Sequence, residues 1–136
     1  MHKLSENLKV DPAMNFATLN NSSNTPLWVS MKNYNDIMTI IHSQTIAAGG
    51  ALTCQLRQAT SAAGAGAKNI TGKTAAFTDA EDNTTKTIDC RAEDLDINNS
   101  FIYVGILITE TGVQNAGVDA EFVRGNPRYA QATLPA

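Results

Sequence analysis

The sequence predicts an all-β fold: an antiparallel β-sandwich or a small barrel, with an extended N-terminal arm. Three observations predict it. Short segments alternate apolar and polar residues with a period of two, turn signals rich in Gly, Asn and Asp separate them, and no helical pattern is long enough for βαβ units. A chain of 136 residues, of which 43% are hydrophobic, is long enough to bury the core of one domain.

Residues 1–26 are predicted to be the arm, because they are rich in Asn, Ser and Thr and their isolated hydrophobic residues follow no lasting period. Ser5 favours a short helix over residues 5–10 as its N-cap. The segment is either a disordered terminus or an arm that orders on a neighbouring subunit. Residues 27–136 are then the sandwich domain.

The first half of that domain contains three predicted strands, over residues 27–33, 37–46 and 51–59. The second of these is β-branched and apolar and ends at the turn signal Ala48-Gly49-Gly50. The third alternates cleanly, which is typical of a half-buried antiparallel strand. Its inward side chains are Leu52, Cys54 and Leu56. The Gly/Ala-rich residues 61–67 are predicted to form a loop.

The second half continues with a weaker strand over residues 70–78, a polar turn at 79–83, and an alternating strand over 84–91. Residues 91–100 are predicted to form another turn. In the strand over 84–91, Ile88 and Cys90 point inward.

Residues 101–109 form the strongest predicted strand, and both of its faces are apolar. A strand of this kind lies centrally in a sheet, or its second face meets another subunit. Residues 111–117 close a hairpin, and residues 118–124 pair back with Ala120 and Phe122 inward. Gly125-Asn126-Pro127 ends the sheet.

The charge pattern argues against two classes of partner. The net charge is −3 without a cluster of Lys or Arg, so the basic face that nucleic-acid binding needs is missing. No apolar run is long enough for a transmembrane helix. The first residues lack the apolar stretch of a signal peptide, so we expect synthesis in a host cytoplasm.

Cys54 and Cys90 both lie on the apolar side of alternating strands. If the two strands face each other, the cysteines are a candidate disulfide. The alternative is two buried free thiols that act as small hydrophobic residues.

No residue pattern predicts catalysis, a metal site or a cofactor. His2 and His42 have no metal-binding neighbours at a suitable spacing. The acidic residues of the turns at 79–83 and 91–100 do not follow the ligand spacing of a calcium loop, and Asp and Asn favour turns in any case. We therefore expect a chain that is not an enzyme.

Isolated aromatic, arginine and apolar residues are the candidates for contacts with other proteins, because such residues anchor protein interfaces. The candidates are Leu8, Phe16, Trp28, Tyr103, Arg128 and Tyr129.

Four segments resemble a group of small, β-rich structural proteins of tailed phages. They are LTCQLRQAT at 52–60, AAGAGAKNI at 62–70, RAEDLDINNSFIYVG at 91–105 and RGNPRYAQ at 124–131. The resemblance covers about residues 34–132, and the long N-terminal segment and the two cysteines depart from the group's pattern.

The resemblance implies a head decoration, or cement, protein on the capsid surface of the virion. Its partners would be the major capsid protein and other copies of itself, with a homotrimer expected. One alternative is a neck, collar or tail protein of the virion. An alternative of another class is a glycan-binding module of a receptor-binding protein, for which Trp28 would be the platform.

Overall fold

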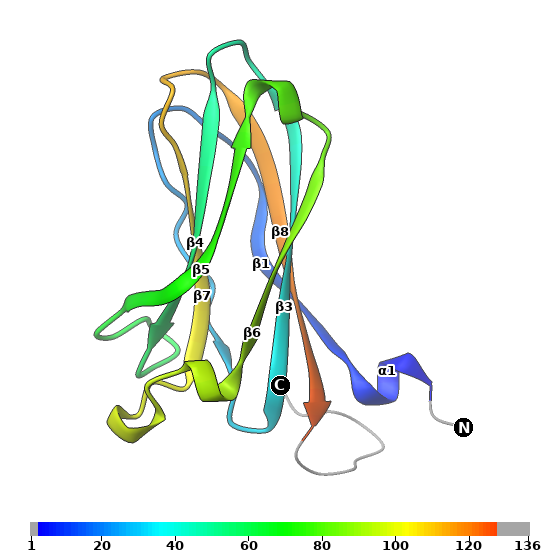
Figure 1. The fold of residues 1–136 in the computed structure, drawn as a ribbon, viewed down its shortest axis with the longest axis vertical. Helices are drawn as coiled ribbons and strands as arrows, with labels where there is room; N and C mark the ends of the chain where they lie inside the picture. The colour runs from blue at the N-terminus through cyan, green and yellow to red at the C-terminus, as the bar shows by residue number, and fades with distance from the viewer. Residues whose placement is uncertain (1–2, 128–136) are drawn as a thin grey trace.

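The computed structural model describes residues 3–127, which fold into two four-stranded antiparallel sheets packed face to face (Figure 1). The predicted antiparallel sandwich is confirmed. Sheet A contains, in spatial order, β1 (Lys9–Leu19), β8 (Ala116–Pro127), β3 (Tyr34–Ile46) and β6 (Thr85–Arg91). Sheet B contains β2 (Val29–Ser30), β7 (Tyr103–Glu110), β4 (Ala51–Ala59) and β5 (Lys68–Thr78).

Among the described residues, helical structure is confined to single turns. An α-helical turn, α1 (Leu4–Asn7), precedes β1, and the 3-10 turns η1 (Asp79–Glu81), η2 (Ala92–Asp94) and η3 (Ile97–Asn99) lie in the connections on either side of β6. Within residues 3–127, no helix has the length and apolar character needed to cross a membrane.

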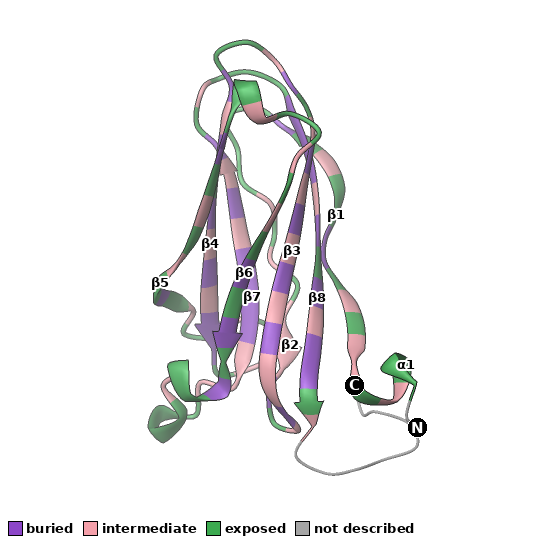
Figure 2. Cartoon of the chain, turned by 45° about the vertical axis from the view of Figure 1, so that its right-hand side comes forward, coloured by how far each residue is buried: buried purple, intermediate pink, exposed green. Residues whose placement is uncertain are grey.

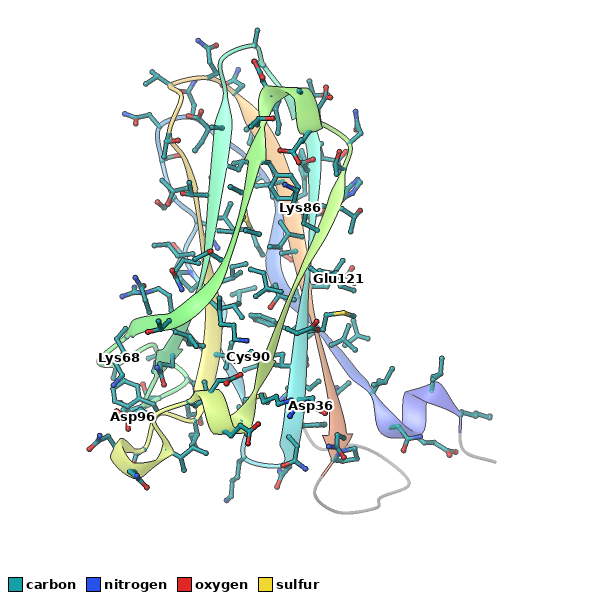
Figure 3. All side chains as sticks on the ribbon, in the orientation of Figure 1. Asp36, Lys68, Lys86, Cys90, Asp96 and Glu121 are labelled. Carbon is teal, nitrogen blue, oxygen red and sulfur yellow. The ribbon has the colours of Figure 1, made fainter. Side chains whose placement is uncertain are left out.

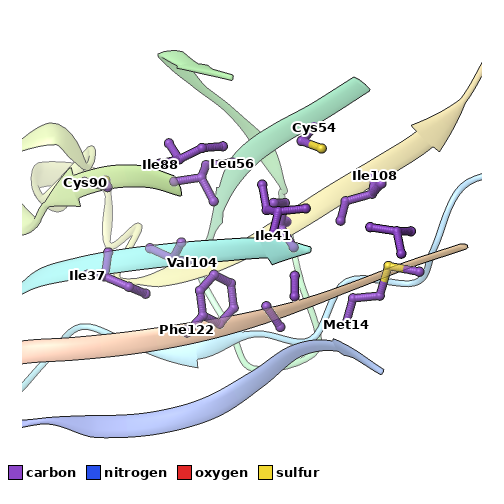
Figure 4. Close-up of a cluster of buried hydrophobic side chains, with 14 of the residues drawn as sticks. Met14, Ile37, Ile41, Cys54, Leu56, Ile88, Cys90, Val104, Ile108 and Phe122 are labelled. Carbon is purple, nitrogen blue, oxygen red and sulfur yellow. The ribbon is translucent and has the colours of Figure 1, made fainter. Parts of the chain in front are cut away.

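The core lies between the sheets, and the period of two in the sequence determines which side chains enter it. Figure 2 shows buried and more accessible residues alternating along β3, β4 and β7. Figure 4 shows side chains from both sheets meeting there. Burial of one Ile, Leu or Phe side chain stabilises a fold by about 1.5–3 kcal/mol. Ile41, Leu52, Leu56, Val104, Ile106, Ile108 and Phe122 have no exposed surface at all.

The strand predicted over residues 101–109 is β7, which lies between β2 and β4 inside sheet B. Its even-numbered residues from Val104 to Ile108 enter the core, and Tyr103 and Leu107 on the other side are half-buried. The prediction of a central strand with two apolar faces is confirmed.

The prediction that residues 1–26 form an arm outside the sandwich is wrong for residues 9–19. These residues form β1, which pairs along β8 and buries Ala13, Met14 and Leu19. The register of β1 against β8 shifts twice, between Pro12 and Met14 and between Met14 and Ala17. Each shift interrupts the alternation of side chains, so the sequence shows no period of two.

Residues 20–30 carry the chain from sheet A to the edge of sheet B, beside β7. The side chain of Asn24 acts there as a peptide group would. Its Nδ2 donates to the carbonyl of Ile106 over 3.1 Å, and its Oδ1 accepts from the backbone N–H of Ile108 over 2.7 Å. β2 then pairs with Val104 and Tyr103 farther along. The N-terminal segment therefore belongs to both sheets.

Candidate interaction surfaces

The outer face of sheet A carries a group of apolar side chains at the surface. In strand register, Val10 of β1, Val123 of β8 and Met38 of β3 lie side by side across the sheet, and Asp89 of β6 ends the row. In the next row, Pro12, Glu121, Ile40 and Thr87 are neighbours.

Val10 is 58% exposed, and Met38, Ile40 and Val123 are each partly exposed. A groove lined by Leu8, Met38 and Val123, with Asp36 and Asp89, opens beside the first of these rows. We call Leu8, Val10, Met38, Ile40 and Val123 the sheet A patch.

Two glycines of β8 let N-terminal side chains lie against this face. A Cβ on Gly117 would lie 3.1 Å from the ring of Phe16, and a Cβ on Gly125 would lie 2.9 Å from Cδ2 of Leu8. The small residues therefore permit a close approach that a larger side chain would prevent. Phe16 remains 59% exposed, so it adds to the apolar surface of the face.

Four carboxylates surround and interrupt the sheet A patch: Asp36, Asp89, Asp119 and Glu121. Figure 3 labels Asp36 near the start of β3 and Glu121 beside the middle of the same strand. Among residues 3–127, none of the four carboxylates forms an ion pair or a side-chain hydrogen bond. A cation does border the face, since Arg91 pairs in register with Asp36, but its guanidinium contacts Glu93.

On the outer face of sheet B, the residue corresponding to the sheet A patch is a tryptophan packed on the strands. The indole of Trp28 lies over Gly105 of β7, where a Cβ would come within 2.8 Å of the ring, and against Gly64 of the loop before β5. The chain itself therefore covers part of the indole that a sugar platform would need free. Arg57 of β4, the register partner of Gly105, donates to Oδ1 of Asn69 and to the carbonyl of Ala67.

A buried arginine joins the N-terminal strands to the sandwich. The side chain of Arg124 is 2% exposed and pairs with Asp11 of β1 at 2.5 Å. It also donates to the carbonyl of Ser30 in β2 over 2.8 Å and lies 4.7 Å from the centre of the Tyr34 ring. A charge buried this deeply needs its partners. Arg124 therefore holds β1 and β2, from different sheets, to one point.

Glu110, at the other end of the sandwich, is a buried carboxylate held by backbone groups. It accepts hydrogen bonds from the N–H groups of Asn21, Ala51, Gly112 and Gln114 over 2.6–3.3 Å. Burial works against ionisation of Glu110, but these donors hold its pKa below the ordinary value. The ionised carboxylate joins three loops at that end.

Cys54 and Cys90 are free thiols, so the candidate disulfide between them is not formed. Cys54 faces the core from sheet B, next to Ala75 and Ile108, whereas Cys90 belongs to sheet A and pairs in register with Ile37. Figure 4 shows the two apart, with other core side chains between them. Burial raises the pKa of the Cys54 thiol to about 12 and, with nearby Asp94, that of Cys90 to about 11.

Two acidic residues of the turns form close pairs with lysines. Asp96 contacts Lys68 at 2.6 Å and Glu81 contacts Lys86 at 2.6 Å, and these lysines hold the pKa of each carboxyl below its ordinary value. In the described part of the chain, no group of three or more His, Cys, Asp or Glu side chains is placed to hold a metal ion. His42 exchanges a hydrogen bond with the Thr85 hydroxyl.

The residues predicted as interface candidates divide between the two sheets. Leu8 and Phe16 lie on the outer face of sheet A, Trp28 and Tyr103 lie on that of sheet B, and Arg128 and Tyr129 fall outside the described residues. Met38, Ile40 and Val123 were not among the candidates. Their signal was present, since Met38 and Ile40 alternate with the inward Ile37 and Ile41, which makes both sides of β3 apolar.

No family model matches this sequence, and no curated protein matches it. Solved structures do resemble the fold. The exported protein XepA of PBSX aligns with a TM-score of 0.60 and 8% identity, over 100% of this chain and 44% of XepA. A chain of the Triatoma virus empty capsid aligns with a TM-score of 0.50 and 10% identity, over 98% and 100% of the two chains.

A third structure, that of infectious bursal disease virus Gx strain, aligns with a TM-score of 0.51 and 8% identity, over 93% of this chain and 34% of the viral chain. The present chain thus spans less than half of the XepA and bursal virus chains. At such identities the likeness concerns the fold, a sandwich of two antiparallel sheets.

Proposed function

We propose that this chain is a structural protein of a tailed-phage virion, and that it decorates the capsid exterior as a cement protein. The observation that carries the proposal is the sheet A patch, a group of apolar side chains that stay partly or largely exposed on an outer face of the sandwich. Exposed apolar groups of this kind mark protein contacts. The resemblance of residues 34–132 to small phage proteins supports the virion as the location, as do XepA of PBSX and the Triatoma virus capsid, which share the fold.

The mechanism would be shared burial of surface. Each copy covers the sheet A patch against adjoining capsid subunits, and contacts that are weak singly act together on a repeated lattice. The sandwich suits this role because its rigid core holds Met38 and Val123 in place before binding, which limits the conformational entropy that binding costs.

The test uses purified heads of the encoding phage from which this protein is absent. The wild-type chain should bind them and raise the temperature at which they release DNA. Met38→Asp, which places a charge in the sheet A patch, should abolish binding. Asn83→Asp is the matched control, since it adds the same charge at an exposed site in the turn before β6, outside both outer faces, and should bind as the wild type does.

Cryo-imaging of the decorated heads shows where the bound protein lies. Density spread over the shell supports a cement role, whereas density at the neck or tail alone contradicts it and favours the collar or tail alternative. Equal binding by wild type and Met38→Asp would show that the sheet A patch does not contact the capsid.

We also propose that the chain forms a homotrimer, with Trp28 and Tyr103 on the outer face of sheet B as contacts between copies. Both side chains are only half-buried in the single chain. The solution mass, measured with and without reductant, tests this part. A trimer that reductant leaves intact is expected because both thiols are buried. A monomer at every concentration would contradict it.

A further inference from the structure

We propose that the partner of the sheet A face presents lysine or arginine side chains around an apolar centre. This inference rests on the proposed function, because it specifies the chemistry of the capsid surface that the sheet A patch contacts. It is carried by the four carboxylates that share the face with the patch and have no partners among residues 3–127.

The carboxylates lie where any partner that covers the patch must also cover them. Glu121 lies between Pro12 and Ile40 in register, Asp89 ends the row of Met38 and Val123, and Asp119 is the register partner of His42. Register partners on one face have Cβ atoms about 4.5–5.5 Å apart. A surface that contacts Val123 and Ile40 therefore also takes water from Glu121.

A carboxylate that loses water without gaining a partner destabilises the complex. An apolar partner surface would leave Glu121 and Asp119 in that state, and an acidic one would add repulsion. A surface with Lys or Arg opposite these positions satisfies the carboxylates and lets the patch be buried. Charge complementarity of this kind also speeds association.

A second copy of this chain does not supply that surface. Two sheet A faces related by a twofold axis would place Asp119 and Glu121 of one copy near the same acidic residues of the other. Four basic residues outside this face are already engaged within the chain: Arg57 with Asn69, Lys68 with Asp96, Lys73 with Asp94, and Lys86 with Glu81. Because the face itself would meet like charge in a second copy, the partner we propose is a different protein.

The central experiment compares Glu121→Lys with Asp82→Lys. Both replace an exposed carboxylate that has no side-chain partner among the described residues, and both change the net charge by two, but Asp82 lies in the turn before β6, away from the sheet A patch. Binding of both variants to undecorated heads is measured from low to high NaCl, after circular dichroism has shown that each is folded.

Glu121→Lys should weaken binding about tenfold or more at low salt, and Asp82→Lys should change it less than about twofold. Binding of the wild type should weaken as NaCl rises, because salt screens the pairs at the rim. The affinity of Glu121→Gln for undecorated heads should lie between those of the wild type and Glu121→Lys.

A second arm uses a defined probe without any phage particle: a peptide of alternating Leu and Lys, and its counterpart with Glu in place of Lys. Binding is followed by the backbone amide NMR signals of the wild type. The Lys peptide should shift signals of β3 and β8, the Glu peptide should not, and Glu121→Lys should lose the response. Equal shifts from both peptides, or shifts confined to sheet B, would overturn the inference.

The two arms separate the two proposals. If the Lys peptide binds the sheet A face but heads bind no wild-type protein, the capsid role fails and the inference about basic partners stands. If heads bind the wild type, do not bind Met38→Asp, and bind Glu121→Lys as tightly as the wild type, the capsid role stands and the inference about charge fails.

Discussion

The two outer faces of the sandwich differ in what the chain itself covers. On sheet B, Trp28 lies over Gly105 at the centre of the face, and Arg57 beside it is hydrogen-bonded within the chain. On sheet A, Met38 and Val123 are partly exposed beside Val10, which is 58% exposed, and the carboxylates around them have no partners among residues 3–127. One N-terminal segment thus places its indole on sheet B and leaves the centre of sheet A open to another molecule.

The two ends of the sandwich differ in how a buried charge is stabilised. Arg124 has a carboxylate partner, whereas Glu110 has only backbone N–H donors. Both anchor the N-terminal segment, Arg124 through Asp11 and Ser30 and Glu110 through Asn21. The attachment of this segment therefore determines which of its side chains lie on each outer face: Val10 and Phe16 on sheet A and Trp28 on sheet B.

The largest effect on stability is expected from Asp11→Ala. It leaves the buried guanidinium of Arg124 without its carboxylate, so the free energy of unfolding should fall by about 3 kcal/mol. Urea denaturation of wild type and Asp11→Ala measures this difference in the free energy of unfolding. The control is Glu93→Ala, which removes the partner of Arg91 in a pair whose side chains are both 72% exposed, and should cost less than about 0.5 kcal/mol. Equal effects would show that Arg124 does not anchor β1.

The next effect concerns the contact between Trp28 and sheet B. Gly105→Ala places a methyl group 2.8 Å from the ring, so the indole must move, and unfolding should become easier by about 1–3 kcal/mol. In a Trp28→Ala background the same substitution should have little effect, because the ring is gone. A double-mutant cycle from thermal unfolding gives the coupling. Additive effects would contradict the packing of Trp28 on Gly105.

A smaller effect should appear on acidification, through Glu110. Its pKa is lowered in the folded state, so its contribution to stability is fully present above the ordinary value of 4.5 and is lost as the pH falls through the folded pKa. Urea midpoints of wild type and Glu110→Gln should therefore differ at pH 7 and converge as the pH falls below 4.5 and through the folded pKa. A constant difference over that range would show that ionised Glu110 does not stabilise the loops around it.

The smallest effect is expected from polar substitutions in the sheet A patch. Met38→Gln and Val123→Thr change side chains that are already partly in water, so the free energy of unfolding should change by less than about 1 kcal/mol. Binding to undecorated heads should nevertheless weaken. The matched core substitution Ile41→Thr, at a site with no exposure, should destabilise strongly. A large loss of stability from Met38→Gln would place the patch in the core rather than at an interface.

Local periodicity determined the fold class and most of the strands. Alternation over residues 51–59 placed Leu52, Cys54 and Leu56 inward, and the apolar run over 101–109 indicated a central strand; both are confirmed. These features were accessible because a strand with a regular register shows its buried face as every second residue.

Other features depended on contacts between segments far apart in the sequence. The register shifts of β1 hid it among polar residues, and its place in sheet A depends on β8, about a hundred positions later. Likewise, only the paired strands show that Cys54 and Cys90 lie apart, and that Asp36, Asp89, Asp119 and Glu121 share one face with Met38 and Val123. The sequence by itself determined which side of each regular strand is apolar. The tertiary structure decided which strands are neighbours, because pairing register is a property of two segments and not of either one.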